Sequence, residues 1–189
     1  MFGKLILLTA LLSPLSALAL DFENHLGLGI NGDTFKSDLP AGQDVENDYG
    51  LGLTLGVKSS VFWGNVGLRS GVFAEYKKVS IEDDFAGAGR GDIDLTAYYA
   101  AIPVNLQFNV NDRWSIFGGI IPRILLAKSC DSCGRFDDDS KILVNYTNLG
   151  IGYEMSEKFS VDVSFQQAQD DNFEDLKINT AQVLFLYRL

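Results

Sequence analysis

The alternation of aliphatic residues with glycine or polar residues constrains the fold of this chain more than any other feature. Clear examples are Tyr49–Val57, Ile102–Val110, Phe159–Gln166 and Val183–Leu189. A period of two residues is the period of a β-strand, in which successive side chains point to opposite faces of the sheet. Beyond Ala19 every apolar stretch is interrupted in this way, so the sequence predicts no membrane-spanning helix there.

The alternation predicts an all-β domain of eight strands whose connections are alternately long and short. The predicted strands are Phe22–Asn31, Tyr49–Val57, Val66–Tyr76, Ile93–Val110, Trp114–Ala127, Lys141–Glu154, Phe159–Gln167 and Lys177–Leu189. The longer connections are Gly32–Asp48, Lys77–Asp92, Lys128–Ser140 and Ala168–Leu176, and the shorter ones are Lys58–Asn65, Asn111–Arg113 and Met155–Lys158. This pattern is typical of an antiparallel up-and-down transmembrane β-barrel, with short periplasmic turns and long extracellular loops.

The two faces of the predicted strands have the polarity of a membrane barrel. Hydrophobic residues make up 47% of the chain and gather on one face, while the other face is rich in glycine, as at Gly50, Gly52 and Gly56. Small residues fit the narrow interior of an eight-stranded barrel. An apolar exterior fits lipid, and closure of the barrel satisfies every backbone hydrogen bond inside the hydrocarbon.

The N-terminus has the features of a secretory signal peptide. Lys4 precedes the apolar run Leu5–Leu12, and Ala17-Leu18-Ala19 matches the small-x-small pattern of a cleavage site. The sequence therefore predicts a signal peptide over residues 1–19, cleaved near Ala19, and a barrel domain over residues 20–189.

Cys130 and Cys133 are separated by two residues in a stretch rich in serine, aspartate and glycine. In the oxidising space that an exported chain enters, a local disulfide between them is expected. A thioredoxin-like redox site would need a helix N-terminus in a βαβ context, and a zinc site would need two more ligands. Because the single histidine, His25, is far away in sequence, both alternatives are disfavoured.

Four segments resemble the small OmpA/OmpX-type outer-membrane barrel families: Ala17–Ala19, Tyr99–Leu106, Ile151–Val161 and Val183–Leu189. The resemblance covers the whole mature chain and implies an outer-membrane protein of a Gram-negative-type bacterium. It also implies recognition of the C-terminal strand, Val183 to Leu189, by the barrel-assembly machinery, although the chain ends in leucine where these families carry an aromatic residue. The expected surroundings are outer-membrane lipid and lipopolysaccharide.

Several charged residues fall on positions predicted to face the barrel interior. They are Arg69, Glu75, Arg123, Glu154, Asp162 and Arg188, and His25 is a further candidate. An isolated charge in a narrow interior is costly, so we expect a paired charge network that fills the barrel. A narrow ion path is the functional alternative, which the tight bore of eight strands disfavours.

The chain carries a net charge of −10, and most of its 25 acidic residues fall in the predicted long connections. This charge favours solubility at the cell surface and argues against nucleic acid as a partner. Carboxylates also suit divalent cations, although none of these stretches has the spacing of an EF-hand loop. The candidate metal ligands are Asp137, Asp138, Asp139, Asp170 and Asp171.

The sequence thus predicts a non-enzymatic surface protein with no catalytic residues and no cofactor. One alternative is a lipid A-modifying barrel enzyme, which would need a histidine base beside a serine and an acid; only His25 is present, and no His-x-Ser pair occurs. The other is a soluble lipocalin-like carrier, which would carry Gly-x-Trp in its first strand and a polar outer face.

Overall fold

The computed structural model describes residues 21–37, 49–83, 91–131, 142–169 and 176–189. The described residues form nine strands: β1 (Asp21–Ser37), β2 (Tyr49–Trp63), β3 (Val66–Asp83), β4 (Gly91–Ala101), β5 (Val104–Asn109), β6 (Trp114–Asp131), β7 (Leu143–Glu154), β8 (Phe159–Ala168) and β9 (Leu176–Arg188). None of the described residues belongs to a helix long and apolar enough to cross a membrane.

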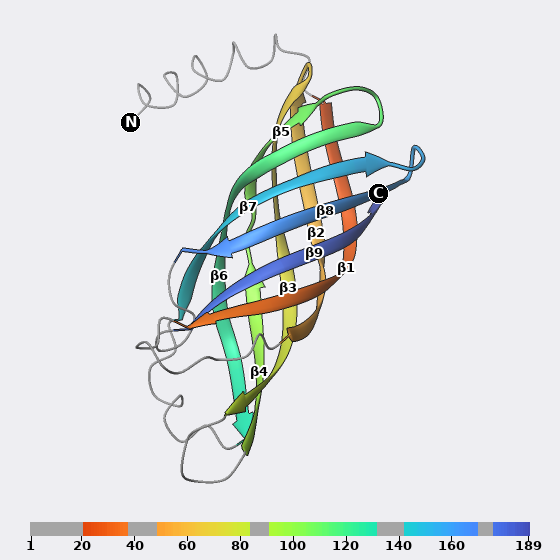
Figure 1. Cartoon of the computed structure of the whole chain (residues 1–189). Coiled ribbons are helices and arrows are strands. Elements are labelled where there is room, and N and C mark those ends of the chain that lie inside the picture. Colours follow the sequence, from red (N-terminus) through yellow and green to blue (C-terminus); the bar gives the residue numbers. More distant parts are fainter. Residues whose placement is uncertain (1–20, 38–48, 84–90, 132–141, 170–175) are drawn as a thin grey trace, which may run out of the picture.

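The strands close into one antiparallel barrel, in which β1 pairs with both β2 and β9 (Figure 1). Strands β4 and β5 share a single position between β3 and β6, so the predicted eight-stranded barrel is confirmed, with its fourth strand in two pieces. The interruption lies at Ile102 and Pro103. Pro103 has no N–H group and cannot donate a hydrogen bond to a neighbouring strand. The preceding residue keeps contact with β6, because the Ile102 N–H donates to the carbonyl oxygen of Pro122 at 3.0 Å.

The first three strands continue beyond their predicted ends. The predicted connections are therefore wrong at their first residues, Gly32, Lys58 and Lys77, which lie within β1, β2 and β3. The prediction ended these strands where outward aliphatic residues give way to polar ones, but strand pairing needs only a partner backbone. Strands β2 and β3 are joined by a tight turn, in which Gly64 has a φ of 66°, a left-handed conformation typical of short hairpins.

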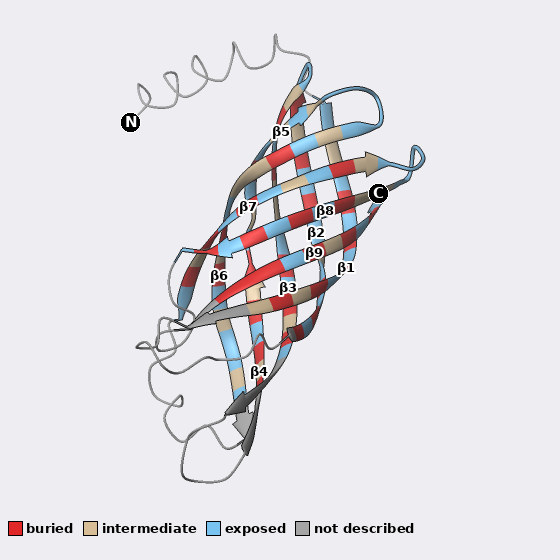
Figure 2. Ribbon diagram, viewed as in Figure 1, coloured by how far each residue is buried: buried red, intermediate tan, exposed pale blue. Residues whose placement is uncertain are grey.

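Burial alternates along the strands in the sense expected of a membrane barrel (Figure 2). Large aliphatic residues such as Leu28 and Leu55 are more than half exposed on the outside, whereas Arg69 and Glu75 are 4% exposed inside. A soluble barrel has the opposite polarity, because water would meet the outer face. The soluble lipocalin-like alternative is therefore wrong.

Aromatic rings pair on the outer face near both ends of the barrel. The ring centroids of Tyr76 and Tyr98 lie 5.4 Å apart, those of Trp114 and Tyr153 lie 4.6 Å apart, and those of Phe159 and Tyr187 lie 5.2 Å apart. All three pairs are direct register partners on neighbouring strands. The first pair lies toward the end where the longer connections join the strands, here called the loop end, and the other two lie next to the short turns at the opposite, turn end. These positions are those of the interfacial girdles of membrane barrels.

Close strand approach requires glycine at position 119. A Cβ atom there would lie 2.7 Å from the Cα of Asn105 and still closer to the carbonyl oxygen of Val104. We expect Gly119→Leu to destabilise the barrel by about 1–3 kcal/mol, because backbone atoms cannot yield to the new side chain. The measurement is the midpoint of urea unfolding in detergent micelles. The folded fraction at each urea concentration is read from the mobility shift of unboiled samples on SDS gels.

The matched control is Gly32→Leu, since a Cβ atom at Gly32 meets nothing within 4 Å. This variant is expected to unfold at the wild-type midpoint. Equal destabilisation by the two substitutions would contradict the steric explanation.

Candidate functional site

Two groups of buried charges occupy the barrel interior. The turn-side cluster consists of Lys58, Arg69 and Asp162, which come from β2, β3 and β8. Arg69 donates from Nη2 to the Asp162 carboxylate, and Lys58 Nζ lies 3.5 Å from the same oxygen. The Arg69 guanidinium also stacks on the Phe117 ring, 3.9 Å from its centroid. Two cations therefore share one buried carboxylate.

The loop-side cluster consists of Asp33, Glu75, Lys77 and Arg123, all of them buried. Arg123 Nε lies 2.7 Å from Glu75 Oε2, and Lys77 Nζ donates to Asp33 Oδ1 at 2.6 Å. Two cations thus face two anions, and the formal charge of the cluster is balanced. The Tyr146 ring lies beneath the Arg123 guanidinium, 3.9 Å from its carbon to the ring centroid.

Neutral polar side chains extend the loop-side cluster across the bore. Arg123 donates to Gln166, and Gln166 donates to Gln182 Oε1 at 3.0 Å. Gln182 in turn donates to Asn31 Oδ1 at 3.0 Å and to Thr54 Oγ1 at 3.1 Å. This chain of hydrogen bonds joins β6, β8, β9, β1 and β2, so it ties strands on opposite sides of the interior to one another.

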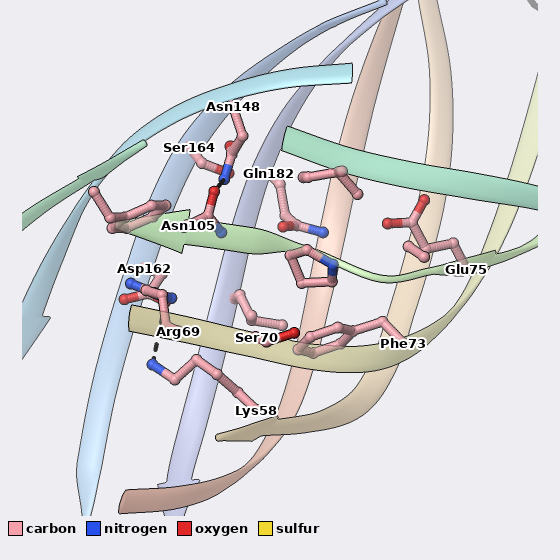
Figure 3. A pocket seen from close by; sticks show the side chains of 15 residues that line it. Lys58, Arg69, Ser70, Phe73, Glu75, Asn105, Asn148, Asp162, Ser164 and Gln182 are labelled. Atoms are coloured by element: carbon pink, nitrogen blue, oxygen red, sulfur yellow. Dashed lines mark hydrogen bonds and ion pairs between the residues drawn. The ribbon is translucent and has the colours of Figure 1, made fainter. Parts of the chain in front are cut away.

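Little space is left between the two clusters. The cavity there has a volume of about 40 Å³, and its lining includes Lys58, Arg69, Glu75 and Gln182. Figure 3 shows side chains from several strands pointing into it, with Arg69 and Asp162 against each other on one side and Glu75 on the other. Such a volume has room for only a few water molecules.

The structure divides the predicted interior charges among three places. Arg69 and Asp162 meet in the turn-side cluster, and Glu75 and Arg123 meet in the loop-side cluster. Arg188 and Glu154 lie instead at the turn-end rim, where their side chains are 34% and 46% exposed and where Arg188 also pairs with Glu23 at 2.8 Å.

His25 is buried at the level of the turn-side cluster and is the register partner of Lys58 and Arg188. Its Nδ1 atom makes no hydrogen bond among the described residues. Through Nδ1, therefore, the histidine has no described partner of the kind that a nucleophilic site requires.

Three members of the clusters were missed by the sequence prediction. Asp33, Lys58 and Lys77 fall in segments predicted to be connections, yet all three are buried in strands. The alternation itself contains the signal: Lys58 continues the inward phase of Gly56, and Lys77 continues that of Glu75. Following the phase past the last aliphatic residue would have placed them inside.

Other predicted sites lie outside the described residues. Asp137, Asp138, Asp139, Asp170 and Asp171 are among them, as is Cys133. The backbone of Cys130 is described as the register partner of Leu95, but its side chain is not, so the disulfide stays a prediction. Within the described part of the chain, no group of three or more His, Cys, Asp or Glu residues is placed to hold a metal ion.

Removing one partner of a buried ion pair should cost more than removing both. We expect Glu75→Gln to destabilise the barrel by about 3 kcal/mol, because it leaves the Arg123 charge short of its carboxylate. Combining Glu75→Gln with Arg123→Met should recover most of that loss, since no unpaired arginine remains. The urea midpoints of the two single variants and the double variant form the test. Simple addition of the single effects would contradict the pairing.

Comparisons with known proteins agree with this architecture. The family model described as the outer membrane protein beta-barrel domain matches residues 5–188. A comparison with functionally curated proteins finds no match.

Three solved structures illustrate the similarity. Neisserial surface protein A (NspA) is 12% identical, with 88% of this chain and 97% of that chain covered and a TM-score of 0.59. Ail, the attachment invasion locus protein of Yersinia pestis, is 16% identical, with coverage of 89% and 99% and a TM-score of 0.49. OprG from Pseudomonas aeruginosa is 14% identical, with coverage of 88% and 96% and a TM-score of 0.46.

At this level of identity, the likeness to NspA concerns the fold alone, and that fold is the one derived above from strand pairing and burial. The family match extends over nearly the whole sequence. The chain therefore belongs to the family of proteins with an outer-membrane β-barrel domain.

Proposed function

We propose that the protein is a sealed, non-enzymatic barrel of the Gram-negative outer membrane, which acts through the acidic segments that it presents at the cell surface. The observation that carries this proposal is the interior, which is filled by paired charges and leaves a cavity of only about 40 Å³. A protein built around a transport path would need an open bore.

The ion pairs themselves oppose conduction. Lys77, Arg123 and their carboxylate partners are almost completely buried, so a passing ion would have to separate charges that have no water to replace the lost partner. Breaking such a pair costs several kcal/mol. The hydrogen bonds from Arg123 through Gln166 to Gln182 add a second barrier at the same level.

In this proposal, the acidic segments act from the loop end of the barrel. The ends of β1, β3, β6 and β8 meet there, and the segments that follow them contain 12 of the 25 acidic residues. Carboxylate-rich segments suit divalent cations and, through bridging cations, the phosphates of lipopolysaccharide. Host, phage or other envelope factors are further proposed partners of these acidic segments. Export by a signal peptide cleaved near Ala19, and assembly guided by Val183 to Leu189, are part of the proposal.

Conductance of the purified full chain in planar lipid bilayers tests the sealed interior. We expect no stable unitary conductance for the wild type. The double variant Glu75→Ala, Arg123→Ala should show discrete current steps, because it removes the side chains that close the loop side of the bore. A stable unitary conductance of the wild-type protein would overturn the proposal.

Calcium titration tests the surface segments. We expect saturating Ca²⁺ to raise the thermal midpoint of the micelle-bound barrel by about 5 °C, since a ligand that binds only the folded state stabilises it. Replacing Asp137, Asp138 and Asp139 together with asparagine should remove most of the rise. Asp112→Asn, in a turn at the opposite end, is the control and should leave it unchanged. A midpoint that does not respond to Ca²⁺ would exclude the cation site.

A further inference from the structure

A groove lies on the outer wall of the barrel, across β3, β2, β1, β9 and β8. Its volume is about 680 Å³, and apolar side chains form most of its surface, among them Ile30, Leu51, Leu53, Val163 and Val183. Leu51 is 74% exposed and Ile30 58% exposed, so these side chains face the surroundings of the barrel and not its interior. The groove is therefore separate from the charged interior.

The floor of the groove is made by two small register partners, Gly32 of β1 and Ala181 of β9. The packing does not require glycine at position 32, because a Cβ atom there would meet nothing within 4 Å. The inward-facing Gly29 differs, since its Cβ would lie 2.7 Å from the Val183 carbonyl oxygen. Among the described glycines only Gly64 has a positive φ, so the backbone does not require glycine at position 32 either. A larger side chain at position 32 would extend into the groove.

The groove reaches the aromatic pair near the loop end of the barrel. Tyr76 lines it, and the Tyr76–Tyr98 ring pair belongs to the aromatic girdle at the loop end. Lys78 also lines the groove, is exposed, and is the register partner of Leu51. Aromatic girdles mark the depth of the lipid headgroups, and an ammonium group at that depth attracts phosphate.

Further lysines lie beyond the groove on the same strands. Lys36 and Lys177 are register partners in β1 and β9, toward the loop end from Gly32 and Ala181. Their backbone positions place two further basic residues on strands that also form the groove, in a chain with a net charge of −10. The combination of an apolar groove and the ammonium group of Lys78 in its lining complements a lipid that carries both acyl chains and phosphate.

We infer that this groove binds one acyl chain of a phosphorylated glycolipid of the outer leaflet, with a lipid phosphate against Lys78. The inference rests on the proposed placement of the barrel in the outer membrane, with the loop end at the cell surface. It goes beyond the sealed interior, on which it does not depend. Because the groove and the bilayer are both apolar, specificity for one lipid comes from the fit of the chain to the groove and from the charge. A lipid without phosphate would lose the electrostatic contribution from Lys78.

Native mass spectrometry of the full chain, folded in detergent and titrated with diphosphorylated lipid A, measures this binding directly. We expect Lys78→Gln to weaken the apparent Kd about five-fold, which corresponds to the loss of one interfacial lysine. Gly32→Leu should weaken it at least as much, by filling the groove. Dephosphorylated lipid A should bind the wild type about as weakly as diphosphorylated lipid A binds Lys78→Gln.

Two control variants make the same kinds of change, a lost positive charge and an enlarged side chain, at positions outside the groove. Lys158→Gln removes one positive charge at the turn end, and Ala74→Leu enlarges an exposed residue of β3 outside the groove. Both should keep the wild-type Kd. The heat-dependent gel shift of each variant establishes that it is folded, so that weak binding cannot be ascribed to misfolding.

Three results would overturn the inference. The first is equal affinity for phosphorylated and dephosphorylated lipid A. The second is unchanged binding by Gly32→Leu, which would place the lipid elsewhere. The third is a dimer of the chain that Gly32→Leu dissociates, which would make the groove a contact between two copies. None of these results bears on conductance, so a failure here is distinguishable from a failure of the sealed-barrel proposal.

Discussion

Pairing of the first strand with the last is the interaction on which the rest of this structure depends. In hydrocarbon no water is available to backbone N–H and C=O groups, so a sheet can persist there only if it has no free edge. The β1–β9 register runs from His25 opposite Arg188 to Ser37 opposite Leu176 and removes both edges at once. Even the break at Pro103 respects this requirement, since β5 resumes pairing with the same two neighbours as β4.

Closure with eight strand positions makes the interior narrow, and the narrow interior explains its contents. Three phenylalanine rings fit because a glycine lies beside each: Phe62 rests against Gly67, Phe73 against Gly56, and Phe117 against Gly150. The remaining space is taken by charges, which are tolerated because each group has a partner of opposite sign on another strand. The same pairs that stabilise the barrel also close it, so stability and lack of a transport path have one origin.

The outer wall is shaped by different forces from those of the interior. Lipid accepts any apolar side chain, so the sizes of outward residues are free to vary without cost to folding. Gly32 illustrates this freedom, because nothing in the packing asks for a small residue there. A hollow on such a surface can therefore be selected for what it binds, whereas the glycines inside are fixed by steric contact.

The sequence by itself determined the strand number, the closed antiparallel architecture, the polarity of the two faces and the inward position of residues such as Arg69 and Glu75. It did so because a period of two residues is a local property that the chain displays directly. The sequence prediction failed where the aliphatic pattern ends, which is why Asp33, Lys58 and Lys77 were assigned to connections. Only the tertiary structure decided which charges meet. Arg69 and Asp162 are 93 positions apart in the sequence, and their pairing depends on the register and closure of the whole barrel, which no local pattern specifies.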